Sequence, residues 1–170
     1  MTRLHNRFSL SVECGTEQSQ VEKFAEHFRD LKWTIGNRIE AQCQVDIFIN
    51  EDGNWGCRVY PSGLNEIGVD APESAYLMTE LGILLYHRLR SAPYFRYGMV
   101  GIELDEFSTY SELIDDPTVA SLPGIVVSED ILQLLDAPPA FRNFAMGYFW
   151  KPYEGGKDSG LEKGNKRRHS

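Results

Sequence analysis

Three acidic residues that follow an apolar run are the first candidates for chemistry in this chain. Glu103, Asp105 and Glu106 end an expected strand that holds Val100 and Ile102. On a strand, Glu103 and Asp105 project to the same side about 7 Å apart, where paired carboxylates bind a hard cation or do acid–base work. No third ligand or partner base lies nearby in the sequence, which favours a solvated strand end. We therefore predict no metal site and no catalytic residue, and we place these carboxylates on a partner-binding surface.

The histidines and cysteines form no recognisable site, because none lies at metal-ligand spacing from another. The four histidines are spread along the chain: His5, His27, His87 and His169. The three cysteines fall in apparent strands: Cys14, Cys43 and Cys57. We expect these thiols to be buried and reduced, which together with the lack of an apolar signal segment predicts a cytoplasmic protein. Phosphate-binding glycine loops and the HExxH, GxSxG and Rossmann patterns are absent, so no cofactor is predicted.

The C-terminal part is rich in aromatic residues: Phe141, Phe144, Tyr148, Phe149, Trp150 and Tyr153. Such a cluster either closes a core or forms a binding hot spot, because aromatic side chains carry large apolar area at low conformational cost. We expect the three phenylalanines to belong mostly to the core. Tyr148, Trp150 and Tyr153 are expected to be partly exposed and to serve as partner-binding anchors.

The elements that must position these residues begin with a strand and a helix. Apolar and polar residues alternate over residues 8–14, the pattern of a half-buried strand whose polar side faces solvent. Ser19 and Glu22 have the spacing of a capping box, so a helix is expected to begin there. His27 lies off the apolar stripe of this helix and is expected to face solvent.

A hairpin is the clearest local prediction. Residues 44–49 and 55–59 alternate between apolar and polar types on either side of Asp52-Gly53, where glycine adopts the positive φ of a tight turn. The next turn is expected at residues 61–63, followed by a short strand over 66–69.

The C-terminal half predicts one long helix and several short elements. The helix is expected from Asp70 to about Arg90, and its core-facing stripe is Ala75, Met78, Leu81, Leu85 and Leu89. A strand over 97–107, a short helix over 109–114, a strand over 125–127 and a helix over 128–135 follow. Strands clustered in sequence predict an α+β fold, with a mainly antiparallel sheet of about five to seven strands and helices packed on one face. The other face of the sheet is expected to stay open for a partner.

Charge separates the chain into two parts. Residues 1–154 are expected to form a single globular domain, and residues 155–170 a disordered basic tail, since the tail is polar and glycine-rich. The chain carries a net charge of −8, and the tail holds five Lys or Arg against two acidic residues, which leaves the body at −11. So negative a body disfavours nucleic acid and favours a basic protein partner. No apolar stretch is long enough to predict a membrane span.

Two functional classes fit these features. The first is a non-catalytic protein-binding module, such as an inhibitor, an immunity-type protein or an assembly factor, with the size and acidity of many small bacterial interaction proteins. Its acidity would steer it to a basic partner, and exposed aromatic residues would supply affinity. The alternative is a small enzyme or ligand-binding domain with a pocket between the open sheet face and the aromatic segment. We favour the binding module.

Overall fold

The computed structural model describes residues 8–35, 39–62, 72–102, 109–116, 122–135 and 140–152. The strands are β1 (Phe8–Gly15), β2 (Lys32–Ile35), β3 (Ile39–Ile49), β4 (Trp55–Ser62), β5 (Tyr97–Ile102), β6 (Val126–Ser128), β7 (Arg142–Ala145) and β8 (Tyr148–Trp150). The helices are α2 (Gln18–Phe28), α3 (Pro72–Leu89), α4 (Tyr110–Asp115) and α6 (Glu129–Leu134). None of the helices in these ranges is long and apolar enough to cross a bilayer.

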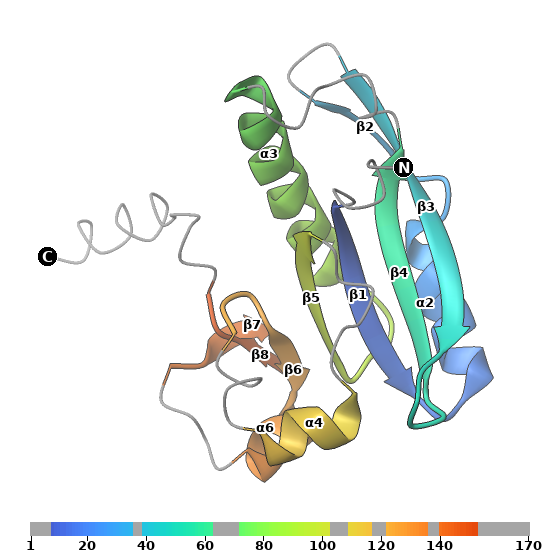
Figure 1. Cartoon of the computed structure of the whole chain (residues 1–170), viewed down its shortest axis with the longest axis vertical. Helices are drawn as coiled ribbons and strands as arrows, with labels where there is room; N and C mark the ends of the chain where they lie inside the picture. Colours follow the sequence, from blue (N-terminus) through green and yellow to red (C-terminus); the bar gives the residue numbers. More distant parts are fainter. Residues whose placement is uncertain are drawn as a thin grey trace, which may run out of the picture.

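The protein is α+β, as the sequence predicts, and its strands form one antiparallel sheet (Figure 1). The strand order is β2-β3-β4-β1-β5-β6-β8-β7, and the sheet has eight strands rather than five to seven. The additional pair is β7 and β8, which the aromatic C-terminal segment forms. The expected strand over 66–69, the capping residue Asp70 and the tail over 155–170 lie outside the described residues.

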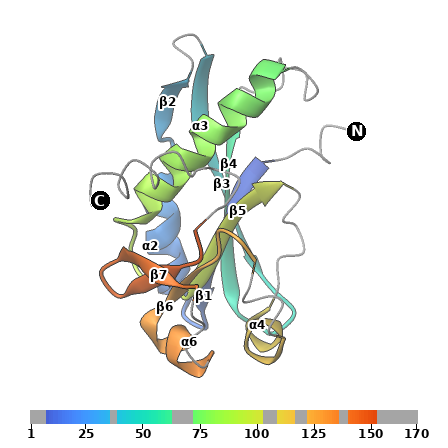
Figure 2. The ribbon, with the colours of Figure 1, turned by 90° about the vertical axis from the view of Figure 1, so that its left-hand side faces the viewer.

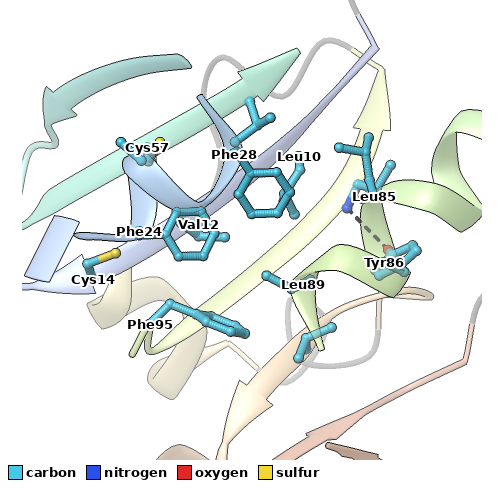
Figure 3. Packing of buried hydrophobic residues seen from close by; sticks show 14 of the residues in the cluster. Leu10, Val12, Cys14, Phe24, Phe28, Cys57, Leu85, Tyr86, Leu89 and Phe95 are labelled. Atoms are coloured by element: carbon cyan, nitrogen blue, oxygen red, sulfur yellow. Dashed lines mark hydrogen bonds between the residues drawn. The ribbon is translucent and has the colours of Figure 1, made fainter. Parts of the chain in front are cut away.

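The main core lies between the sheet and the two longer helices. Phe24 and Phe28 of α2 pack on Leu10 and Val12 of β1, beside Leu85 of α3 (Figure 3). The α2 residues Val21, Phe24, Ala25 and Phe28 are buried. Of the predicted α3 stripe, Leu81, Leu85 and Leu89 are buried and Met78 is half-buried, and nothing is described of the Ala75 side chain. Packing of amphipathic helices on an apolar sheet face is therefore the main stabilising contact.

Helices cover both faces of the sheet, so the prediction that they pack on one face is wrong. Figure 2 shows α2 and α3 on one side and α4 on the other. Tyr97 of β5 and Val127 of β6 point away from the main core and pack with Leu113 of α4 and Ile131 of α6 in a second apolar cluster. The short helices occupy this face because each presents a single buried residue that fits between the two strands.

The residues of strand β1 show that the sheet face opposite the main core is not open to solvent. The strand lies between β4 and β5 in the middle of the sheet, and its polar residues Ser9, Ser11 and Glu13 are buried as fully as its apolar ones. The expected half-buried strand is thus a fully buried strand. The alternation of residue types misleads here for two reasons. Arg96 neutralises the buried Glu13, and the Ser11 hydroxyl is buried although it has no hydrogen-bond partner among the described residues.

The β3–β4 hairpin agrees with the sequence prediction. Val45 pairs with Val59 and Ile47 with Cys57, and Gly53 in the turn has φ of 81°. Phe48 lies over its cross-strand neighbour, where a Cβ on Gly56 would come within 2.6 Å of the ring. The turn predicted at residues 61–63 is not present at its first two positions, because β4 continues to Ser62 and Pro61 pairs with Cys43.

Two details of α2 differ from the prediction. The helix begins at Gln18 after Glu17, with no side-chain cap, so Ser19 lies in the first turn and forms no capping box. His27 does not simply face solvent, since its Nε2 donates to the carbonyl oxygen of Arg88 at 3.1 Å. The Arg88 guanidinium returns two hydrogen bonds to the His27 carbonyl oxygen, at 2.8 and 3.1 Å, and so joins the C-terminal ends of α2 and α3.

We predict that Leu85→Ala lowers the free energy of unfolding by about 2–5 kcal/mol, because the side chain is completely buried and its removal leaves a cavity. Ile83→Ala on the same helix is the matched control, since Ile83 is 58% exposed, and it is expected to cost less than about 0.5 kcal/mol. Urea unfolding followed by circular dichroism measures both. Equal effects of the two variants would contradict the position of α3 on the sheet.

We also predict that the protein becomes less stable as the pH is lowered, because protonation of His27 is less favourable in the folded state. Burial, reinforced by the charge of Arg88, lowers the pKa of His27 below its ordinary value of 6.5. The unfolded chain therefore binds the proton more tightly, so the contribution of His27 is complete above pH 6.5 and is lost as the pH falls through the folded pKa. Urea unfolding between about pH 7.5 and 5 measures the slope. His27→Gln is expected to reduce this slope, and an unchanged slope would contradict the role of His27.

Candidate functional site

The predicted partner-binding residues are only partly described. Glu103, Asp105, Glu106 and Tyr153 lie outside the described residues, and their role stays a prediction. Tyr148 and Trp150 belong to β8, which pairs with β7 around a turn at Met146 and Gly147. We call β7, this turn and β8 the C-terminal ribbon. Gly147 has φ of 82°, the left-handed conformation that lets glycine close the turn.

Tyr148 holds the ribbon to the segment that precedes β5. Its ring stacks on Phe95 with the ring centroids 4.4 Å apart and an angle of 10° between the planes. Its hydroxyl donates to the carbonyl oxygen of Phe95 at 2.8 Å and accepts from the backbone nitrogen of Phe95 at 3.1 Å. Burial raises the pKa of Tyr148, which keeps the hydroxyl protonated. Although half-buried, as expected, the side chain is occupied by contacts within the protein.

Trp150 holds the other end of the ribbon to α3. Its ring centroid lies 5.1 Å from those of both Tyr86 and Phe144. The Tyr86 hydroxyl donates to the carbonyl oxygen of Gly124 at 2.8 Å, and so ties the same helix to the segment before β6. Phe144 is buried as predicted, whereas Phe141 and Phe149 are half-buried. Tyr86 was not identified from the sequence. The feature that could have indicated it is its position as an aromatic residue beside the apolar stripe of a long helix.

Exposed apolar side chains lie at the turn of the ribbon and beside Tyr148. Met146 is 95% exposed and Tyr94 is 43% exposed. The backbone nitrogen of Glu129 donates to the carbonyl oxygen of Gly147 at 2.9 Å, which places the first turn of α6 against the ribbon turn. Burial raises the pKa of Tyr94, while the charge of Arg96 lowers it and the charge of Asp130 raises it. We call Tyr94, Met146, Glu129 and Asp130 the turn patch.

A buried ion pair connects β1 to the segment that contains Tyr94. Arg96 donates to both carboxylate oxygens of Glu13, at 2.7 and 2.5 Å, and its guanidinium carbon lies 4.1 Å from the centroid of the Tyr110 ring. Glu13 also accepts from the backbone nitrogen of Gly15 at 2.9 Å. The hydrogen bonds to Glu13 raise the pKa of Arg96. Because every charge here has a partner, the pair is structural, and sequence reasoning missed it.

The thiols are poor nucleophiles. Cys14, Cys43 and Cys57 are free and buried, as the sequence predicts. Burial raises the pKa of Cys43 and of Cys57 to about 12, so both are protonated at neutral pH, and it raises that of Cys14 as well. Within the described ranges, no group of three or more His, Cys, Asp or Glu side chains is placed to hold a metal ion.

We predict that Tyr148→Phe lowers the free energy of unfolding by about 1–3 kcal/mol, because both Phe95 backbone groups lose their hydroxyl partner while the stacked ring remains. Tyr94→Phe is the matched control, since no hydrogen bond of the exposed Tyr94 hydroxyl to a described residue is found, and it is expected to change stability by less than about 0.5 kcal/mol. Thermal and urea unfolding of the three proteins measure the difference. A neutral Tyr148→Phe would show that the ribbon does not depend on this contact.

Comparison with known proteins adds no family to this description. No family model matches the chain, and neither a curated protein nor a solved structure is significantly similar to it. Contacts, exposure and charge of the described side chains therefore carry the functional inference.

Proposed function

We propose that the chain is a non-catalytic protein-binding module of the inhibitor, immunity or assembly-factor type. The observation that carries this proposal is the turn patch, where Met146 and Tyr94 are exposed beside the acidic first turn of α6. Methionine and tyrosine are enriched at protein interfaces, since methionine adapts to irregular surfaces and tyrosine combines apolar area with a polar tip. A methionine that is almost fully exposed at a rigid turn is the kind of side chain that a partner covers.

The partner in this proposal is a basic protein. The body carries a charge of −11, and Glu129 and Asp130 place two exposed carboxylates beside the apolar residues of the turn patch. Such an arrangement steers a positively charged partner and rejects a negatively charged one. Tyr153, Glu103, Asp105 and Glu106 remain part of the proposed surface. Three buried, unpaired thiols fit a reducing compartment, so we propose that the protein acts in the cytoplasm.

In this proposal Trp150 supports the turn patch, although an aromatic residue of this type is expected to contact the partner directly. Because its ring packs against Tyr86 and Phe144, its removal would loosen the ribbon and move the turn patch with it. Trp150 therefore supports the surface, and Met146 and Tyr94 form it.

The experiment begins with affinity capture by the full chain from its native host and mass spectrometry of the proteins that co-purify. Surface-binding kinetics with a recovered partner then test the mechanism. We predict that association slows markedly between low salt and about 0.5 M, because the Debye length falls from tens of Å to a few. Tyr94→Ala and Met146→Ala are expected to speed dissociation roughly tenfold or more, with little change in the association rate.

Ile83→Ala is the control for these variants, since it removes an exposed apolar side chain of α3 outside the turn patch. Asp130→Asn is expected to slow association and to leave dissociation nearly unchanged. Salt-independent association would contradict the electrostatic part of the proposal. If the Tyr94 and Met146 variants dissociate as slowly as the Ile83 variant, the turn patch is not the binding surface.

A further inference from the structure

Two segments that pack together contain no acidic residue, although the chain as a whole is strongly acidic. Residues 81–102 and 140–152 include neither Asp nor Glu. They meet where Phe95 stacks on Tyr148 and where Tyr86 contacts Trp150. Together they hold five cationic side chains: Arg88, Arg90, Arg96, Arg142 and Lys151. The charged side chains of these two segments are therefore all positive, and we call the two segments the positive strip.

Arg90 is the cation of this strip that packs against aromatic rings of the C-terminal ribbon. Its guanidinium carbon lies 4.2 Å from the ring centroid of Phe144 and 5.4 Å from that of Trp150. Nη1 donates to the carbonyl oxygen of Phe144. In the described part of the chain no carboxylate pairs with Arg90, whereas Arg96 is paired with Glu13. The residue is nevertheless exposed, so a ligand has access to it.

The geometry leaves one edge of the guanidinium ready for a ligand. An arginine has five N–H donors in a rigid fork, and the described contacts of Arg90 use only Nη1. The Nε and Nη2 edge is the one that binds a carboxylate through two parallel hydrogen bonds. Stacking on Phe144 and Trp150 holds the guanidinium plane in place, which reduces the entropy lost when a ligand binds.

A second arginine lies opposite Trp150 on the neighbouring strand. Arg142 is the cross-strand neighbour of Trp150, so both side chains lie on the same face of the ribbon, and Arg142 is exposed. We call Arg90, Phe144, Trp150 and Arg142 the arginine corner. It combines two guanidinium groups with the half-buried ring of Trp150 above the buried Phe144. The turn patch, at the opposite end of β8, shares none of its residues.

We propose that the arginine corner binds an acidic peptide segment of a partner protein, with a carboxylate on the Arg90 fork and an adjoining apolar side chain against Trp150. A peptide is favoured over single-stranded nucleic acid because the body, at −11, repels a polyphosphate along its whole length. A short segment with a few carboxylates meets mainly the local positive strip. This site does not depend on the turn patch, which takes side chains of the opposite charge.

The test uses the full chain and a labelled decapeptide in which Glu and Asp alternate with Leu and Phe, with binding followed by fluorescence anisotropy. A matched peptide with Gln and Asn in place of the acids, and a ten-nucleotide oligo-dT, are the comparison probes. The acidic peptide is expected to bind at least tenfold more tightly than either. Arg90→Gln is expected to weaken its binding roughly tenfold or more, as loss of a bidentate charged hydrogen bond does.

Matched variants separate the effect of the guanidinium geometry on peptide binding from the effect of its positive charge. Arg29→Gln removes the same charge from an exposed arginine after α2 and is expected to change binding less than twofold. Arg90→Lys keeps the charge but loses the fork, so it is expected to bind several-fold more weakly than the native protein. Circular dichroism checks the fold of each variant. If Arg90→Gln does not fold, Arg142→Gln replaces it, with a loss of several-fold expected.

Three results would overturn the proposal. The first is equal affinity for the acidic peptide and its amide counterpart. The second is an Arg90 or Arg142 variant that binds as tightly as the Arg29 variant. The third is tighter binding of oligo-dT that Arg90→Gln abolishes, which would identify the site as one for nucleic acid. None of these results bears on the turn patch, whose test uses a recovered partner and other residues.

Discussion

A carboxylate buried on the central strand must be neutralised, and Arg96 does this for Glu13 while it also contacts β6 and α4. Its guanidinium binds the carboxylate, its backbone nitrogen donates to the Glu13 carbonyl oxygen at 2.7 Å, and its own carbonyl oxygen accepts from Ser128 at 2.9 Å. The Tyr110 ring of α4 covers the charge. Loss of one partner of a buried pair costs about 3–5 kcal/mol because the other charge is left uncompensated. The start of β5, the end of β6 and α4 are therefore positioned by one residue.

The segment that Arg96 fixes then determines what the C-terminal ribbon exposes. Phe95 lies between Phe24 of α2 and Tyr148 of the ribbon, so the main core continues through it into β8. A ribbon of four and three residues cannot be stable by itself. It must bury its aromatic rings against α3 and the segment before β5. The rings thus support the ribbon. The groups that we propose for partners are Tyr94 and Met146 of the turn patch and, at the arginine corner, the Arg90 guanidinium with the exposed part of the Trp150 ring.

Local features of the structure were predictable from the sequence, and long-range pairings were not. The β3–β4 hairpin and the buried stripe of α3 follow from period and turn chemistry within about ten residues. The pairing of Glu13 with Arg96 spans 83 residues, and nothing near Glu13 signals a buried carboxylate. Strands β7 and β8 are too short for alternation to be visible. In the candidate site, the half-burial of Tyr148 and Trp150 was predictable. Their internal contacts, and the packing of Arg90 on Phe144 and Trp150, depend on the tertiary structure.

The two candidate surfaces are close enough to act on one partner. Tyr148 and Trp150 are two residues apart on β8, about 7 Å at the rise of a strand, with the turn patch beyond one end and the arginine corner beyond the other. A basic protein with an acidic segment next to its basic surface would match both. If this partner bound in the reverse orientation, its basic surface would face the arginine corner and its acidic segment would face the turn patch. Like charges placed against each other in this way cost several kcal/mol. In the proposed complex, the positive strip in an otherwise acidic body would thus select a binding orientation as well as a class of partner.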